Sequence, residues 1–263
     1  MNENQTPPEY PQAPQPQRVQ LAVPSSRPYA TYVLLGVTVF VYLLQVLAQV
    51  FNLNVMTPSG ISDVVTALGV KDDGLIRAGQ LWRLVTPVFL HASLLHIGFN
   101  MYALFLYGRS VEARFGHGRF LLLYFLSGFA GNVLSFLLTP NPSLGASTAI
   151  FGLLAAEAVF IIQNRGMIGR QADRALVNLF VIAAINLFIG FSTSGVDNFG
   201  HLGGLLGGVL FTWFGGPRWK VEGIYPSLRL VDEREGHGSL AGTIAVLLFF
   251  IPLTALGWIW VVK

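Results

Sequence analysis

PNPSLGASTAIFG, residues 140–152, is the stretch around which the predicted fold is organised. Pro140 and Pro142 break a loop, and an apolar helix is predicted to follow from Ser147 to Gln163. At about 1.5 Å per residue this helix is ~25 Å long, whereas the hydrocarbon core of a bilayer is about 30 Å thick. If the far end of the helix reaches the interface, Ser147 lies inside the membrane. A hydroxyl there costs free energy unless it is paired or faces water, so we expect the chain to supply a cavity and a histidine.

The composition indicates an all-α polytopic membrane protein. Of 263 residues, 53% are apolar and only 11% are charged, and the mean hydropathy is +0.58. An ordinary soluble domain is about 25% charged. The absence of cysteine excludes disulfides, thiolate catalysis and cysteine-based metal sites. The net charge of +3 is spread over loops that flank apolar segments, so it indicates topology rather than nucleic-acid binding.

The chain divides into a tail, a core and a C-terminal helix. Residues 1–28 are rich in proline and glutamine and are predicted to be disordered. The core covers 29–215, a linker covers 216–239, and the last helix lies in 240–263. No small-residue cleavage site follows the first apolar run in the right place, so we do not expect a cleaved signal peptide. The apolar segments are predicted at about 29–51, 92–111, 119–139, 146–163, 175–192, 198–215 and 240–261.

The basic residues predict which loops are cytoplasmic. Lysine and arginine concentrate in cytoplasmic loops, and 12 of the 16 in this chain fall on one side of the predicted topology. The N-terminus is then inside, the C-terminus is outside, and the second, fourth and sixth helices all enter from the outer face. The 12 are Arg18, Arg27, Arg109, Arg114, Arg119, Arg165, Arg170, Arg174, Arg218, Lys220, Arg229 and Arg234; the other four are Lys71, Arg77, Arg83 and Lys263.

Four polar residues fall near the outer ends of the even-numbered helices. His96 and Asn100 are four residues apart, so they share one helix face. Ser147 begins the fourth helix, and His201 lies at the start of the sixth. The topology therefore places all four at similar depth on the same side. Polar side chains inside a membrane are costly and mark function by default.

A glycine pattern predicts how His201 reaches Ser147. Gly204 and Gly208 remove side chains from one stripe of the sixth helix, which allows a second helix to approach closely. If the partner is the fourth helix, Gly152 assists the approach and His201 lies beside Ser147. The alternative interpretation is a packing motif without chemistry.

The chemistry that this pattern favours is nucleophilic catalysis. A serine hydroxyl needs a base to take its proton, and histidine is the usual base at neutral pH. His96, Asn100 and the backbone N–H of Ser147 are candidate donors to a developing oxyanion. Asp197 and Glu157 are possible third members of a triad, but their spacing favours neither. A dyad is simpler, with Phe151 packed on the imidazole in place of an acid.

Other residues have structural interpretations. Glu112 is expected to form an ion pair or cap a helix rather than catalyse, and His117 is expected to be solvated. The loop at about 52–91 contains Trp82 and Arg83 among apolar residues. Two interpretations of this loop stay open, a partly helical element lying in the membrane interface and a surface loop with aromatic anchors.

Taken together, these motifs resemble the rhomboid family of intramembrane serine proteases. The resemblance spans roughly 30–215 and implies a six-helix core with a Ser147–His201 dyad, oxyanion donors at His96 and Asn100, and a membrane-embedded loop at 52–91. It also implies that the fifth helix and the loop before the sixth gate substrate entry, and that the extra helix is a "six plus one" variant. The matching pieces are Trp82-Arg83, His96-x-x-x-Asn100, Gly108-x-x-Val-Glu112, Gly145-Ala-Ser147 and His201-x-x-Gly204-x-x-x-Gly208.

Two positions depart from the family pattern. Thr148 stands where glycine usually follows the nucleophile, and its branched side chain is expected to crowd the turn or the oxyanion site. Phe151 stands where some relatives carry tyrosine, so the aromatic contact is kept and the hydroxyl is lost. Because the chain keeps both serine and histidine, an active enzyme is favoured.

Three functions remain to be compared. The first is an endopeptidase, without cofactor or metal, that cleaves transmembrane helices of other proteins near their outer ends in a bilayer, with the bacterial plasma membrane as the simplest location. The second is a catalytically silent rhomboid-like protein that binds membrane clients. The third, a small transporter, is disfavoured because no intramembrane acid or inverted repeat is evident. The sequence specifies neither the substrate nor the oligomeric state.

Overall fold

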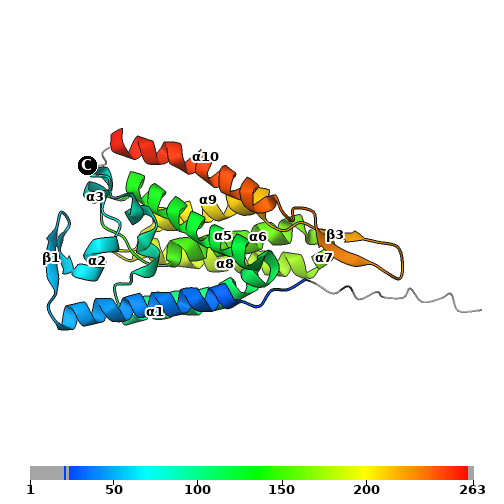
Figure 1. The fold of residues 1–263 in the computed structure, drawn as a ribbon, viewed down its shortest axis with the longest axis horizontal. Coiled ribbons are helices and arrows are strands. Elements are labelled where there is room, and N and C mark those ends of the chain that lie inside the picture. Colours follow the sequence, from blue (N-terminus) through cyan, green and yellow to red (C-terminus); the bar gives the residue numbers. More distant parts are fainter. Residues whose placement is uncertain (1–20, 22–23, 260–263) are drawn as a thin grey trace, which may run out of the picture.

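The computed structural model describes residue 21 and residues 24–259. Of the predicted disordered tail, 1–28, all but residue 21 and residues 24–28 lie outside the described residues. The described chain is mainly helical, with two small antiparallel hairpins at opposite ends of an elongated helical bundle (Figure 1). The helices of the bundle are α1 (Tyr29–Val50), α4 (Leu94–Ala103), α5 (Arg109–Leu138), α6 (Ser147–Gln163), α8 (Gln171–Ser192), α9 (Asn198–Gly215) and α10 (Gly238–Ile259).

The helical path from residue 94 to residue 138 combines the predicted second and third helices. A π-helical turn, η3 (Leu104–Gly108), joins α4 to α5 without a loop. The helical path is broken at Gly116, whose φ of +75° is a left-handed value that glycine adopts readily. The chain thus reverses near residue 116, close to the predicted loop between these two helices.

Several helices have the length and composition of membrane spans. Within residues 24–259, four helical stretches are long and apolar enough to cross a membrane, namely α1, residues 94–138, α8 and α10. The 17-residue α6 is apolar but shorter, and it begins at Ser147 as predicted. The chain is therefore a helical polytopic membrane protein, as its composition predicts.

Segment 52–91 covers the end of the bundle at which α6 begins. It is built from short elements rather than from a transmembrane helix, and two of its helices start at aspartate caps. Asp63 accepts a hydrogen bond from the Thr66 amide, and Asp72 accepts one from the Leu75 amide. Its elements are β1 (Asn54–Thr57), β2 (Gly60–Asp63), α2 (Val64–Gly69), α3 (Asp73–Arg77), η1 (Leu81–Leu84) and η2 (Thr86–Phe89).

The opposite end of the bundle carries α7 (Arg165–Ile168) and the second hairpin. Strands β3 (Trp219–Glu222) and β4 (Arg229–Asp232) pair in the predicted linker between α9 and α10 (Figure 1). The linker is thus ordered into a hairpin.

Close packing of α5, α6 and α9 forms the centre of the bundle. A Cβ atom placed on Gly204 would lie 2.0 Å from the Thr148 carbonyl oxygen, and one on Gly208 would lie 2.2 Å from the Gly152 carbonyl oxygen. These contacts leave no room for a side chain, so α6 and α9 touch through their backbones, as the glycine pattern predicts. Two further glycines, Gly203 and Gly207, face Ala130 of α5 with the same lack of space.

Candidate active site

Ser147 and His201 meet at the junction of α6 and α9. Ser147 is the first residue of α6, and His201 lies in the first turn of α9. The backbone contact between these helices brings their first turns together. The Ser147 Oγ and the His201 Nε2 are 2.8 Å apart, within hydrogen-bond distance. His201 is buried and Ser147 is partly buried.

Two neighbours hold the His201 imidazole. The Oδ1 of Asn198 lies 3.3 Å from the Nδ1 of His201, one turn earlier on α9. A proton on Nδ1 donated to this oxygen leaves Nε2 free to accept from the serine hydroxyl. The ring of Phe151 stacks on the imidazole, with 4.4 Å between ring centroids and 13° between planes. The Asn198 contact thus favours the tautomer with its proton on Nδ1, and the Phe151 contact fixes the plane of the imidazole ring.

Neither candidate acid contacts the imidazole. Asp197 accepts hydrogen bonds from the Gly200 amide, at the start of α9, and from the Thr139 hydroxyl. Glu157 forms an ion pair with Arg114, more than two helical turns along α6 from Ser147. The polar partner of the His201 Nδ1 is an amide, which the sequence analysis did not single out, although its spacing of three residues from His201 on a helix was a usable signal.

His96 lies beside the loop that leads to Ser147. A Cβ on Gly145 would lie 2.8 Å from the His96 Nε2 and 3.6 Å from the Ser147 Oγ, so ring and hydroxyl flank the same glycine. Gly145 has a φ of +131°, and both this backbone angle and the contact with His96 require glycine. Asn100 is buried on the same helix, and its amide nitrogen donates to the His96 carbonyl oxygen at 2.9 Å. One N–H of this amide remains for another acceptor.

His91 contributes more to this region than the sequence analysis indicated. Its Nε2 accepts a hydrogen bond from the Ala146 amide at 3.4 Å, directly before the serine. Its ring meets the His96 ring edge-on, with 5.0 Å between centroids. Its own amide donates to the Gln45 side chain of α1. His91 therefore links α1 to the loop that carries Ser147.

Thr148, the residue after the serine, lies between three helices. Its side chain packs among α5 and α9, against Gly131 and Gly200. A Cβ on Gly131 would lie 2.7 Å from the Thr148 Cβ, so the threonine occupies space that this glycine leaves open. The first turn of α6 thus directs residue 148 into the interface with α5 and α9.

The motif residues away from Ser147 and His201 hold backbone groups in place. Arg83 is buried and donates to the carbonyl oxygens of Ala67 and Val70 at the end of α2. Trp82 is half-exposed, and its indole donates to the Leu68 carbonyl oxygen. Each of these contacts satisfies a helix-end carbonyl that has no partner within its own helix.

Glu112 accepts hydrogen bonds from the first amides of α1, those of Ala30 and Thr31. It also pairs with His117, which corrects the expectation that His117 is merely solvated. Within residues 24–259 no group of three or more His, Asp or Glu side chains is arranged to hold a metal ion.

A polytopic helical bundle in which a serine and a histidine from two helices are within hydrogen-bond distance is the architecture of a membrane-embedded protein with a candidate serine nucleophile. The rhomboid domain model matches residues 78–218, more than half of the chain, so this chain belongs to the rhomboid family. This match includes Ser147, His201, His96 and Asn100.

Similar curated proteins include two from a bacterium and one from a plant. The chain is 39% identical over 184 residues to "Rhomboid protease GluP" of Bacillus subtilis, which covers 70% of this chain and 34% of the relative. It is 34% identical over 140 residues to "Putative rhomboid protease YdcA" of the same organism, with 52% and 69% covered. It is 34% identical over 189 residues to "RHOMBOID-like protein 9, chloroplastic" of Arabidopsis thaliana, with 71% and 42% covered. This chain therefore spans only about a third of GluP and under half of the plant protein.

Proposed function

We propose that this protein is an intramembrane serine endopeptidase that uses Ser147 and His201 as a catalytic dyad. The observation that carries the proposal is the 2.8 Å contact between Ser147 Oγ and His201 Nε2 in a helix bundle with membrane-spanning elements. Membership of a family that includes named rhomboid proteases supports it.

The proposed reaction begins when His201 Nε2 takes the hydroxyl proton and Ser147 Oγ attacks a peptide carbonyl. Negative charge then develops on the carbonyl oxygen and needs donors that are already in place. His96, the free N–H of Asn100 and the backbone N–H groups at the start of α6 are the proposed donors. The imidazolium returns its proton to the leaving amine, and a water molecule releases the acyl group by the same route.

The proposed substrates are transmembrane helices of other membrane proteins. A helix hides its peptide bonds in internal hydrogen bonds, so the substrate has to unwind where it is cut, and small or helix-breaking residues ease this. We place Ser147 near the outer face, with the N-terminus inside and the C-terminus outside, and take the bacterial plasma membrane as the location. The basic residues of the opposite loops support this orientation. Segment 52–91 would then lie in the outer interface, and its exposed Met56, Ile61 and Leu68 support that position.

Covalent labelling with a fluorophosphonate probe tests the dyad directly. We expect the folded wild-type protein in detergent to be labelled, Ser147→Ala to remain unlabelled, and His201→Ala to be labelled more slowly by roughly a thousandfold or more. Ser192→Ala is the matched control, because Ser192 is an exposed serine on α8 whose hydroxyl donates to the Phe188 carbonyl oxygen. Mass spectrometry of the modified peptide identifies the serine.

Labelling that persists in Ser147→Ala would overturn the dyad. A folded wild-type protein that neither reacts with the probe nor cleaves a transmembrane substrate would instead favour the alternative function, the binding of membrane clients without catalysis.

A further inference from the structure

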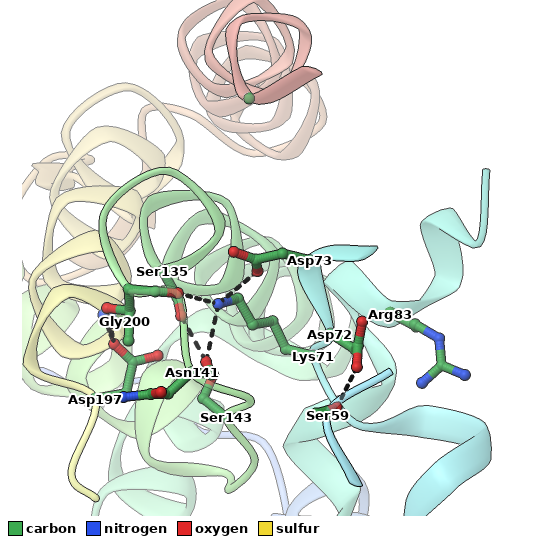
Figure 2. Close-up of polar contacts among 12 residues, drawn as sticks. Ser59, Lys71, Asp72, Asp73, Arg83, Ser135, Asn141, Ser143, Asp197 and Gly200 are labelled. Atoms are coloured by element: carbon green, nitrogen blue, oxygen red, sulfur yellow. Dashed lines mark hydrogen bonds and ion pairs between the residues drawn. The ribbon is translucent and has the colours of Figure 1, made fainter. Parts of the chain in front are cut away.

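Lys71 is a fully buried lysine in the turn between α2 and α3 (Figure 2). Burying a charged group is costly unless all of its hydrogen-bonding groups find partners. The Lys71 Nζ donates to the carbonyl oxygens of Thr139 and Asn141, at 2.5 and 3.1 Å, and forms an ion pair with the Oδ1 of Asp73 at 2.7 Å. Two backbone acceptors and one carboxylate thus compensate the buried charge. Burial lowers the pKa of Lys71, and the carboxylate of Asp73 opposes this effect.

The backbone of Lys71 also binds the loop at residues 139–146, which joins α5 to α6. The Lys71 amide donates to the Ser143 carbonyl oxygen at 3.0 Å, and the Ser143 amide donates to the Lys71 carbonyl oxygen at 3.2 Å. This isolated antiparallel bridge, together with the ammonium contacts, holds the loop at three of its residues. Ser143 lies four residues before Ser147, so the loop bound by Lys71 leads directly into the first residue of α6, Ser147.

A second connection runs from the same loop to the helix of His201. The Thr139 hydroxyl donates to Asp197 Oδ1 at 3.1 Å. The same oxygen caps α9 by accepting from the Gly200 amide at 2.9 Å, and the His201 amide donates to the Asp197 carbonyl oxygen. Figure 2 shows Lys71 reaching toward the loop, with Asp73 and Asp197 on either side. Lys71 therefore binds Thr139, and Thr139 binds the residue that fixes the start of α9.

We propose that Lys71 is a positioning residue whose ammonium group sets the placement of Ser147 relative to His201, through loop 139–146 on one side and Asp197 on the other. Lys71 touches neither residue of the dyad, so it acts only through these elements. The expected effect of Lys71 on the reactivity of Ser147 rests on the proposed function. Its expected effect on the order of loop 139–146 and of the first turn of α9 is independent of that function.

The effect on rate follows from the geometry of the dyad. Serine and histidine belong to different helices, and only their relative position gives the 2.8 Å contact. A misplacement of reacting groups by about 1 Å can slow a reaction by roughly a hundredfold. Without the ammonium group, two loop carbonyls and the Asp73 carboxylate lose their partner, and the loop is expected to loosen.

Lys71→Met tests the proposal because methionine has a similar length and no charge. We expect fluorophosphonate labelling of Ser147 to slow by roughly tenfold to a hundredfold. The probe is small and needs no docked helix, so its rate reports on the nucleophile rather than on substrate binding. Amide hydrogen exchange in residues 139–146 and in the first turn of α9 is expected to rise in the same variant.

Three further variants separate positioning from general destabilisation. Thr139→Val removes only the hydroxyl link to Asp197 and is expected to fold, to slow labelling by several-fold and to raise exchange at the start of α9. Asp73→Asn keeps the carbonyl contacts of Lys71 and is expected to have a smaller effect than Lys71→Met. Arg119→Met is the control, because Arg119 pairs with Asp232 at the far end of the bundle and its loss should leave labelling and loop exchange unchanged.

Folded Lys71→Met and Thr139→Val proteins with wild-type labelling and wild-type exchange would overturn the positioning role. A wild-type protein that is not labelled would refute the proposed function instead. In that case the exchange of residues 139–146 in Lys71→Met still decides whether Lys71 fixes the loop.

Discussion

The contacts of His201 show how a single residue can be oriented without a carboxylate. The Asn198 oxygen lies at Nδ1, the Ser147 hydroxyl lies at Nε2, and Phe151 covers one face of the ring. A buried carboxylate would need its own compensating partners, whereas an amide and an aromatic ring carry no net charge. The site thus obtains orientation from neutral groups.

Replacement of Phe151 tests the contribution of the stacked ring. We expect Phe151→Leu to slow fluorophosphonate labelling by roughly threefold to tenfold, because such ring contacts are worth about 0.5–1.5 kcal/mol. Phe151→Tyr keeps the ring and is expected to label at close to the wild-type rate. Phe160→Leu is the matched control on the same helix, since Phe160 packs on Phe115 and Trp219 rather than on the imidazole. Equal labelling by Phe151→Leu and Phe160→Leu would show that the stack does not orient His201.

The sequence predicts the residues at this scale only in part. Ser147 and His201 stand out because each is a polar residue at the entry end of an apolar helix. Asn198 was overlooked, although it begins the same helix as His201 and lies three residues before it. Lys71 does not stand out, because a polar residue in a loop is ordinary in a sequence. The importance of Lys71 depends on which backbone groups it meets, and those groups lie far along the chain, at residues 139–143.

At the scale of elements, α9 carries glycine on two faces. Gly204 and Gly208 meet α6, while Gly203 and Gly207 meet α5. The small-residue pattern predicted the first pair and its partner helix. The pattern did not predict the contact of Gly203 and Gly207 with α5, because the spacing of glycines on a helix does not specify how many helices pack against it.

Gly204→Ala tests whether the backbone contact between α6 and α9 is required. A Cβ there would lie 2.0 Å from the Thr148 carbonyl oxygen, so the helices must separate. We expect the free energy of unfolding to fall by about 1–3 kcal/mol, as for other overpacked sites, and labelling to slow because Thr148 adjoins the serine. Gly36→Ala is the control, since nothing lies within 4 Å of a Cβ on that α1 glycine. Thermal unfolding in detergent compares the two, and an equal stability of both variants would contradict the close contact.

Element boundaries were predicted best where an apolar run ends at a polar or small residue, as at Ser147, Gln163 and Gly215. The architecture of segment 52–91 could not be predicted in the same way. Its β1–β2 hairpin and its short helices depend on aspartate caps and on Arg83, whose carbonyl partners lie on α2. Periodicity carries little information about elements of four to six residues.

At the scale of the whole molecule, α10 is fastened to the bundle at both ends. Near residue 257, the Arg77 Nε donates to the Gly257 carbonyl oxygen, and the Trp258 indole donates to the Arg77 carbonyl oxygen, each at 3.2 Å. At the other end, Arg119 binds Asp232 and the Arg234 carbonyl oxygen in the hairpin that leads into α10. The predicted extra helix is therefore part of the bundle rather than a loosely attached span.

Replacement of Arg234 tests whether this attachment of α10 stabilises the fold without affecting the reactivity of Ser147. Its guanidinium donates to the Gln163 side chain and the Gly216 carbonyl oxygen, which joins the ends of α6 and α9 to the hairpin. We expect Arg234→Met to lower the free energy of unfolding by about 1–3 kcal/mol, because these acceptors lose a charged donor. Labelling of the folded protein should stay unchanged, since Gln163 ends α6 about 24 Å from Ser147 at 1.5 Å per residue.

The matched control for Arg234 is Arg218→Met in the same hairpin. Arg218 is exposed and pairs with Glu233 at 3.5 Å, and exposed ion pairs contribute about 0–1 kcal/mol. Thermal unfolding in detergent, followed by the labelling rate at a temperature where each variant is folded, separates stability from chemistry. If Arg234→Met slowed labelling while unfolding at the wild-type temperature, the two ends of α6 would be coupled, and the hairpin would influence the dyad directly. If Arg234→Met lowered stability alone, the hairpin and α10 would stabilise the packing of α6 and α9, the helices that carry Ser147 and His201, without affecting the reactivity of Ser147.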